Sequence, residues 1–280
     1  MLLSLKTHRL ALRRPVRRSR QRPGPRYRGL ALIALLFPVC CSPRTTSVAS
    51  AGASRTFRLE LPASLERQRS YFEGEIAAGL DRVAEFFRSA GFDLARTRLI
   101  DSAVVFETTA KAREYLSTQS ATPLDSIPET FAGTVDGERL FLVSRESYRE
   151  SWRALYKEWP WTDATYRQLI VHELEHRAHE AVAISRYGSA EAMGPTWFFE
   201  GLAVACAGQF ESDQPLMDRD QILQAVGAGR TPPVSYPLYG QLVRSLAAEF
   251  GVKALVAHAS HPGFPERLWS GQALRKPKQQ

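Results

Sequence analysis

The stretch richest in chemically active side chains is LIVHELEHRAHEA, residues 169–181, which holds three histidines and three glutamates. Within it, His172, Glu173 and His176 form the pattern HExxH. On an α-helix, side chains four residues apart point the same way and are separated by about 6 Å of rise, so both imidazoles can bind one tetrahedral ion. Zinc lowers the pKa of a bound water to about 7, and a neighbouring carboxylate can take its proton as it attacks a carbonyl. The spacing therefore predicts His172 and His176 as zinc ligands and Glu173 as general base.

The helix that carries this pattern is predicted to have a polar and an apolar face. With His172 set at 0° on a helical wheel, His176 falls at about 40°. The apolar side chains fall opposite, between roughly 160° and 240°; they are Ile170, Leu174, Ala178 and Ala181. Two interpretations are open: the polar face is wet and its histidines do nothing, or that face lines a cleft while the apolar face packs on the core. The metal-ligand spacing favours the cleft.

Two further titratable residues of this helix are not expected to bind the ion. His179 falls at about −20° on the same wheel, but about 10.5 Å of rise separates it from His172, so a straight helix cannot bring all three imidazoles together. We interpret His179 as a solvated neighbour, at the rim of the site or outside its ligands. Glu175, at about 300°, is likewise predicted not to be a ligand.

A third ligand is needed, because an open catalytic zinc site has three protein ligands and a water. Downstream lies GPTWFFEGLAVACAG, residues 194–208, in which Pro195 can begin a helix that places Glu200 among apolar residues. A lone carboxylate there is costly unless it is paired or bound to a cation. Glu200 is therefore the candidate ligand; the alternative is a glutamate on the exposed side of a buried helix.

The combination HELEH and WFFEGLA, with 23 residues between His176 and Glu200, resembles the gluzincin metallopeptidases, specifically the bacterial peptidase MA-like group. The likeness spans about residues 130–260. It implies a thermolysin-like fold, with a small sheet above an active-site helix and a helical lower half. It also implies that His172, His176 and Glu200 bind zinc and that Glu173 is the general base.

Two more stretches fit this resemblance. FAGTVDGERLFLVS, residues 131–144, is similar to the edge strand that borders the cleft, where an extended substrate adds as another strand; it is otherwise an ordinary hairpin. In SYPLYGQLVRSLAAEFG, residues 235–251, Tyr236 matches the tyrosine that hydrogen-bonds the oxyanion. Tyr239 is the alternative, and either tyrosine could be a packed aromatic.

The chain also departs from relatives of this kind. It has no sequence like G-A-M-E-N, which aminopeptidases use to hold a free amino terminus, so nothing supports exopeptidase activity. No acid follows Glu200 closely to support a ligand histidine; Val204 and Ala205 occupy that region. The residues that hydrogen-bond and orient the predicted ligand histidines are therefore left unassigned.

The net charge of +8 does not indicate a nucleic-acid partner. Residues 1–30 hold ten bases and no acid, which leaves 27 bases against 29 acids in the remainder. The basic run is followed by GLALIALLFPVCC, residues 29–41, an apolar segment too short for a spanning helix of about twenty residues. Together they predict an export leader and linker over residues 1–53.

The fate of this leader is open among several routes. Residues 49–51 and 51–53 each offer an A-x-A-like cleavage site. Cys40 or Cys41 could instead be lipidated as in a bacterial lipoprotein, although the residues before them are poor matches to the small ones expected. The paired arginines hint at twin-arginine export, and an uncleaved anchor is the remaining alternative. The domain is thus predicted to be exported, either periplasmic or membrane-anchored.

The remainder, residues 54–272, is predicted to be a single domain, with a basic tail over 273–280. Cys206 would then be its one cysteine, in an apolar run where a buried inert thiol is expected. A strand over 55–62 precedes a long amphipathic helix to Gly91, and a second strand and short helix follow. The Asp136–Gly137 turn then predicts a hairpin, and the chain from Arg145 onward has helical patterning. Strands in one half and helices in the other indicate an α+β fold.

These observations predict an exported zinc-dependent metallohydrolase, a peptidase acting on peptide or protein substrates with one zinc ion per chain. One alternative is a catalytically silent relative that keeps zinc for stability or binds peptides along its edge strand. Another is a basic protein that binds nucleic acid or anionic lipid, which the charge distribution disfavours.

Overall fold

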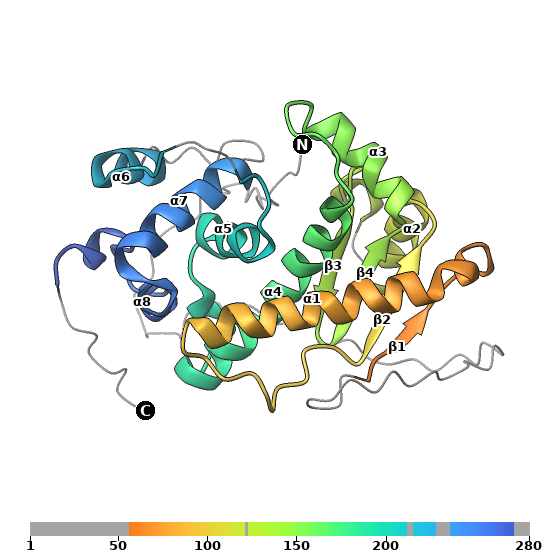
Figure 1. Ribbon diagram of the computed structural model, residues 1–280, viewed down its shortest axis with the longest axis horizontal. Coiled ribbons are helices and arrows are strands. Elements are labelled where there is room, and N and C mark those ends of the chain that lie inside the picture. The colour runs from red at the N-terminus through yellow and green to blue at the C-terminus, as the bar shows by residue number, and fades with distance from the viewer. Residues whose placement is uncertain (1–55, 121–122, 212–214, 228–235, 272–280) are drawn as a thin grey trace, which may run out of the picture.

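The computed structural model describes residues 56–120, 123–211, 215–227 and 236–271 (Figure 1). The predicted leader and the basic tail lie outside these residues, so their assignments stay predictions. None of the helices in the described ranges combines the length and apolar character that crossing a bilayer requires.

The described chain divides into a sheet-bearing half and a helical half. The first half holds β1 (Arg58–Glu60), α1 (Arg69–Ser89), β2 (Ser102–Phe106), α2 (Thr109–Ser120), β3 (Gly133–Asp136), β4 (Arg139–Val143) and α3 (Arg145–Leu155). The second half holds α4 (Ala164–Tyr187), α5 (Thr196–Ala207), α6 (Arg219–Gly227), α7 (Tyr236–Phe250) and α8 (Val252–His258). Short 3-10 turns lie at Ala63–Gln68, Leu124–Ser126, Ala190–Met193 and Glu266–Leu268. This order confirms the predicted α+β class.

The sheet is small and mixed, with the strand order β1-β2-β4-β3. β1, β2 and β4 run parallel, and β3 pairs antiparallel with β4. Gly137, at φ 57°, supplies the left-handed turn between β3 and β4 that most side chains avoid. The predicted hairpin is therefore confirmed, and β3 lies at the edge of the sheet.

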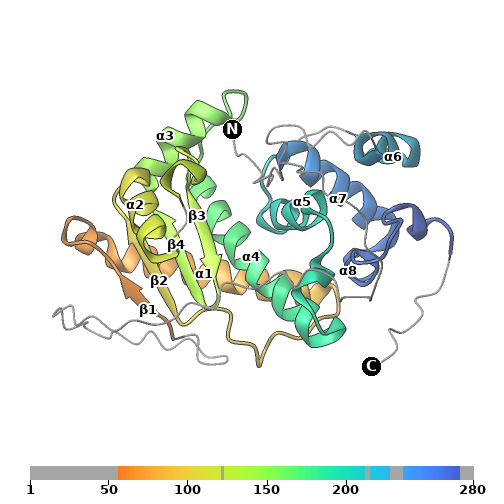
Figure 2. The ribbon, with the colours of Figure 1, turned by 180° about the vertical axis from the view of Figure 1, so that it is seen from behind.

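Helix α4, which carries the HExxH pattern, runs through the middle of the molecule. In both ribbon views it lies between the sheet and the group of α5, α7 and α8, and α1 packs across it (Figure 1, Figure 2). Its first turn is held to the sheet, because the Tyr166 hydroxyl donates to the Val143 carbonyl at 2.8 Å. The helix ends at Gly188, whose φ of 83° allows a left-handed cap. Neighbours on both sides fix the direction in which each side chain of α4 points.

Helix α5 carries Glu200 and begins, as predicted, directly after Pro195. It packs very closely on α7 at Gly201, where an added Cβ would lie 2.5 Å from the Tyr239 carbonyl oxygen. That approach leaves no room for a larger residue, so the glycine next to Glu200 sets the depth of α5 in the fold. Cys206, further along α5, is fully buried, as predicted, and burial raises the pKa of its thiol.

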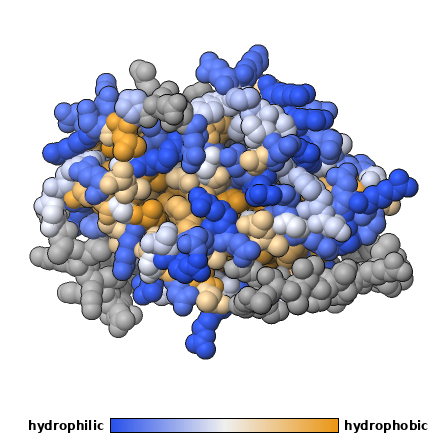
Figure 3. Space-filling model, viewed as in Figure 1, coloured by the Kyte–Doolittle hydropathy of each residue, from blue (hydrophilic) through white to orange (hydrophobic). Residues whose placement is uncertain are grey.

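The molecular surface is mainly hydrophilic on the face shown in Figure 3, with apolar residues gathered toward its centre. Among the described residues, the exposed large hydrophobic side chains are Leu124, Ile184 and Leu216. They come from three separate segments, and single exposed apolar residues of this kind are ordinary in soluble domains.

Candidate metal centre

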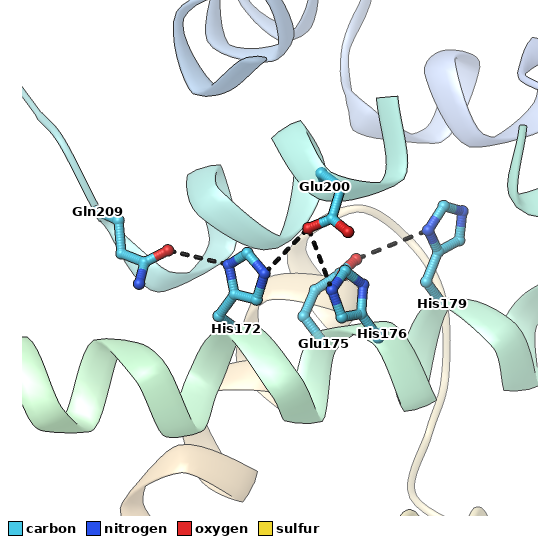
Figure 4. A network of polar contacts seen from close by, with 6 residues as sticks. All are labelled: His172, Glu175, His176, His179, Glu200 and Gln209. Atoms are coloured by element: carbon cyan, nitrogen blue, oxygen red, sulfur yellow. Dashed lines mark hydrogen bonds and ion pairs between the residues drawn. The ribbon is translucent and has the colours of Figure 1, made fainter. Parts of the chain in front are cut away.

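His172, His176 and Glu200 come together between α4 and α5. Oε2 of Glu200 lies 3.2 Å from Nε2 of His172 and 3.5 Å from Nε2 of His176. Figure 4 shows both imidazoles rising from α4 toward the carboxylate on the facing helix. One ligand atom from each residue lies within 4.8 Å of the other two. The three residues predicted as ligands therefore share one site.

The donor set and its spacing fit a small divalent cation. Zinc binds imidazole nitrogen and carboxylate oxygen at about 2.0–2.2 Å in a tetrahedral arrangement, which places neighbouring ligand atoms about 3.3–3.5 Å apart. The two nitrogen–oxygen separations around Glu200, 3.2 and 3.5 Å, lie within about 0.1 Å of this range. These residues can hold one metal ion.

Comparison with known proteins identifies no relative: no protein-family model, curated protein or solved structure matches this chain.

Electrostatics keep the carboxylate of this site ionised. Burial opposes the charge on Glu200, but the contacts with His172 and His176 outweigh it and hold the pKa of Glu200 well below its usual range. Burial also opposes the charged form of His172, yet the hydrogen bond with Glu200 and the charge of Glu173 raise its pKa overall. A negative oxygen facing two imidazoles is an arrangement that a cation would stabilise further.

His172 is oriented by Gln209, a residue that the sequence did not reveal. Nδ1 of His172 lies 2.9 Å from Oε1 of Gln209, so the ring donates from Nδ1 and presents Nε2 toward Glu200 (Figure 4). The segment after α5 turns back at Gly208, whose carbonyl accepts from Gln168 at 2.8 Å, and Arg244 donates to the Gln209 carbonyl at 3.3 Å. The residue that orients the first candidate ligand is thus an amide nine residues after Glu200, rather than the nearby acid that the resemblance would suggest.

Glu173 lies beside the three candidate ligands and is not one of the residues grouped as a possible metal site. Its side chain is buried against the edge strand: a Cβ added at Gly133 would lie 3.1 Å from Cγ of Glu173. Burial raises the pKa of Glu173, while the neighbouring His172 and His176 partly oppose that shift. A raised pKa brings a carboxylate closer to the range in which it both takes and returns a proton near neutral pH.

A pocket of about 110 Å³ opens next to His172 and Glu173, and six of its fourteen lining residues carry the aromatic rings of Phe, Tyr or Trp. These rings belong to Phe131, Tyr148, Trp152, Tyr156, Phe210 and Tyr236. An aromatic pocket with a few polar groups at one end is the usual form of a site for a small ligand or a substrate side chain.

The two candidate tyrosines lie in different places. The Tyr236 ring is 5.4 Å from the His172 ring, and Tyr236 lines the pocket. Burial raises the pKa of its phenol, with a smaller contribution from Glu200, so the hydroxyl stays protonated as a donor. Tyr239 is buried one turn later on α7 and does not line the pocket. Of the two, Tyr236 has the position of a group that could contact a substrate.

The interpretation of His179 as solvated is wrong. His179 and Glu175 are both fully buried, at 0 % exposure, because α1 and α5 cover the side of α4 on which they lie. Rings of Phe87 and Phe198 lie 6.5 Å and 5.8 Å from the His179 ring. Burial lowers the pKa of His179 to about 3 and raises that of Glu175 well above its usual value. The polar face of α4 is therefore largely shielded from solvent, and it carries buried polar residues besides the candidate metal ligands.

Proposed function

We propose that this chain is a zinc-dependent metallohydrolase of the gluzincin type, and that it acts as a peptidase. The observation that carries the proposal is the convergence of two Nε2 atoms of one helix on Oε2 of Glu200, with Glu173 beside them. Two imidazoles and a carboxylate form a donor set found in catalytic zinc sites that keep a fourth position open. The mixed sheet on one side of α4 and the helices on the other agree with the thermolysin-like fold implied by the resemblance.

Each polar group around the site has a task in hydrolysis. When bound, zinc supplies Lewis acidity toward a carbonyl and makes a nearby water more acidic. Glu173 accepts a proton from the attacking water and can return it to the leaving amine. Tyr236 donates a hydrogen bond to the carbonyl oxygen as negative charge develops on it. Gln209 holds the His172 ring so that Nε2 faces the ion.

The edge strand offers a place for the substrate. β3 is paired with β4 on one side and is last in the sheet order, so its other side can receive an extended peptide. Gly133, at the start of β3, leaves room for the Glu173 side chain, which a Cβ at this position would crowd, and it lines the aromatic pocket. A peptide paired with β3 would therefore pass the general base, which favours an endopeptidase that holds a backbone rather than a chain terminus.

The predicted leader favours an activity outside the cytoplasm. Ten bases followed by a short apolar segment direct export. The domain would then act in the bacterial cell envelope, either released into the periplasm or held at the membrane through its leader or a lipidated cysteine.

The proposed activity is tested by incubating the zinc-loaded full chain with a random peptide library and mapping the cleaved bonds by mass spectrometry. We expect cleavage at internal bonds that a chelator stops and added zinc restores. Protein that binds zinc but leaves every peptide intact would instead be a catalytically silent relative.

The oxyanion donor is tested by comparing Tyr236→Phe with Tyr239→Phe. Loss of one oxyanion donor typically lowers kcat by about 10²–10³-fold. We expect that loss for Tyr236→Phe with little change in KM, because the contact is made in the transition state, and near-parent rates for Tyr239→Phe. Steady-state kinetics on one cleaved peptide provide both constants. The reverse ranking would assign the role to Tyr239.

A further inference from the structure

The second ligand histidine has an unusual neighbour on its far side. His172 uses Nδ1 to contact Gln209. The corresponding atom of His176 lies 3.6 Å from Oε2 of Glu175, the residue that precedes it on α4. The other oxygen of Glu175 lies 3.8 Å from Nδ1 of His179 (Figure 4). The three side chains thus form a row that leads from the metal centre into the core.

In the arrangement seen here, this row of side chains lowers the stability of the folded protein. Five buried atoms of this row have no hydrogen-bond partner among the residues that the structure describes: both oxygens of Glu175, Nδ1 of His176 and both ring nitrogens of His179. A buried polar atom that is left without a hydrogen-bond partner lowers the stability of the folded state, and a buried carboxyl group lowers it more. Such groups in a folded protein call for an explanation other than stability.

The surroundings of the row restrict what Glu175 can do. It is fully enclosed, and the aromatic rings of Phe87 and Phe198 lie against His179 behind it. Glu175 therefore cannot reach a substrate in the pocket, and it does not belong to the group of possible metal ligands. The polar groups within ion-pair distance of its carboxylate are the imidazoles of His176 and His179.

We propose that Glu175 is a positioning residue for the metal centre: backed by His179, it accepts a hydrogen bond from Nδ1 of His176 and so directs Nε2 of that ring at the ion. A ligand histidine commonly donates its other nitrogen to a carboxylate or carbonyl, which fixes the ring and makes it a stronger ligand. The present separations exceed a hydrogen bond of about 2.8–3.0 Å, so His176 and Glu175 must approach each other when His176 binds the ion. The inference rests on the proposed zinc site, but not on the hydrolytic reaction.

The test compares the zinc affinity and the metal-free stability of the full chain carrying Glu175→Met, measured by chelator competition and by urea unfolding. We expect zinc affinity to fall about 10–100-fold, the usual effect of removing an outer partner of a ligand. We expect the metal-free stability to stay the same or rise, because methionine replaces a buried carboxyl group that lacks a hydrogen-bond partner with an apolar side chain of similar length. A purely structural role predicts the opposite pattern: unchanged affinity and lower stability.

Two further variants complete the test. Glu175→Gln keeps an acceptor oxygen and should recover most of the affinity lost in Glu175→Met, whereas Glu180→Gln, on the same helix but paired with Arg177, should match the parent. If Glu175→Met does not fold, His179→Phe, which fits beside two phenylalanines, should still weaken zinc binding several-fold. Parent-like affinity in a folded Glu175→Met, or in His179→Phe where Glu175→Met does not fold, overturns the inference. A parent chain that binds no zinc overturns the proposed metal site itself.

Discussion

Glu173→Gln is expected to abolish peptide hydrolysis and to leave the zinc content unchanged. An amide of nearly the same shape fills the space against Gly133 but cannot accept the proton of an attacking water. Loss of a general base typically costs about 10²–10⁴ in rate. Glu173 is not one of the residues whose atoms converge on the candidate ion, so the ligands should stay in place.

This result is checked by measuring rate and metal content on the same preparations. Glu180→Gln is the matched control, because it makes the same change on the same helix at a residue paired with Arg177. The control should retain both full activity and full zinc. If Glu173→Gln cleaves peptides at the parent rate, the assigned base is wrong; if it loses zinc as well, Glu173 acts on the ligands rather than on a water.

Removal of a proposed metal ligand is the second change for which we expect a large effect, here on zinc binding. His172→Ala and Glu200→Ala are each expected to lower the zinc content from about one ion per chain to nearly none under conditions that saturate the parent. Loss of an outer partner alone weakens binding by about 10–100-fold, and loss of a direct ligand should weaken it more. Zinc should also raise the melting temperature of the parent and not that of these variants, because binding to the native state is linked to stability.

Elemental analysis and melting curves with and without zinc measure both effects. His261→Ala is the matched control, since it removes a histidine from the far end of the chain that faces His258 rather than the site. We expect it to retain one ion and the full zinc-dependent rise. Zinc content that survives in either His172→Ala or Glu200→Ala would remove that residue from the ligand set.

Local sequence rules predicted the parts of the site that depend on one helix or one turn. The four-residue spacing of His172 and His176 fixes their common direction, whatever surrounds the helix. Pro195 and the apolar residues near Glu200 located the start of α5, and the Asp136–Gly137 turn located the hairpin. Each of these signals acts over a few residues, which is the range in which spacing and turn chemistry determine structure.

The parts that escaped prediction depend on contacts between distant segments. A helical wheel separates polar from apolar side chains but cannot show that α1 and α5 cover the polar side of α4. The wheel therefore wrongly predicts that His179 is exposed to solvent. Gln209 reaches His172 because the chain reverses after α5 and is held there by Gln168 and Arg244. No spacing rule links residues 37 positions apart in this way. Glu175 directly precedes the candidate ligand His176 in the sequence, but the side chains that surround Glu175 depend on how the helices pack.

The ligand set itself is tested most directly by diffraction from crystals of the protein soaked in zinc, with data collected on both sides of the zinc absorption edge. We predict one strong anomalous peak per chain, within about 2.0–2.2 Å of Nε2 of His172, Nε2 of His176 and an oxygen of Glu200. An anomalous map without a peak between α4 and α5, or with its peak on other residues, would contradict the account.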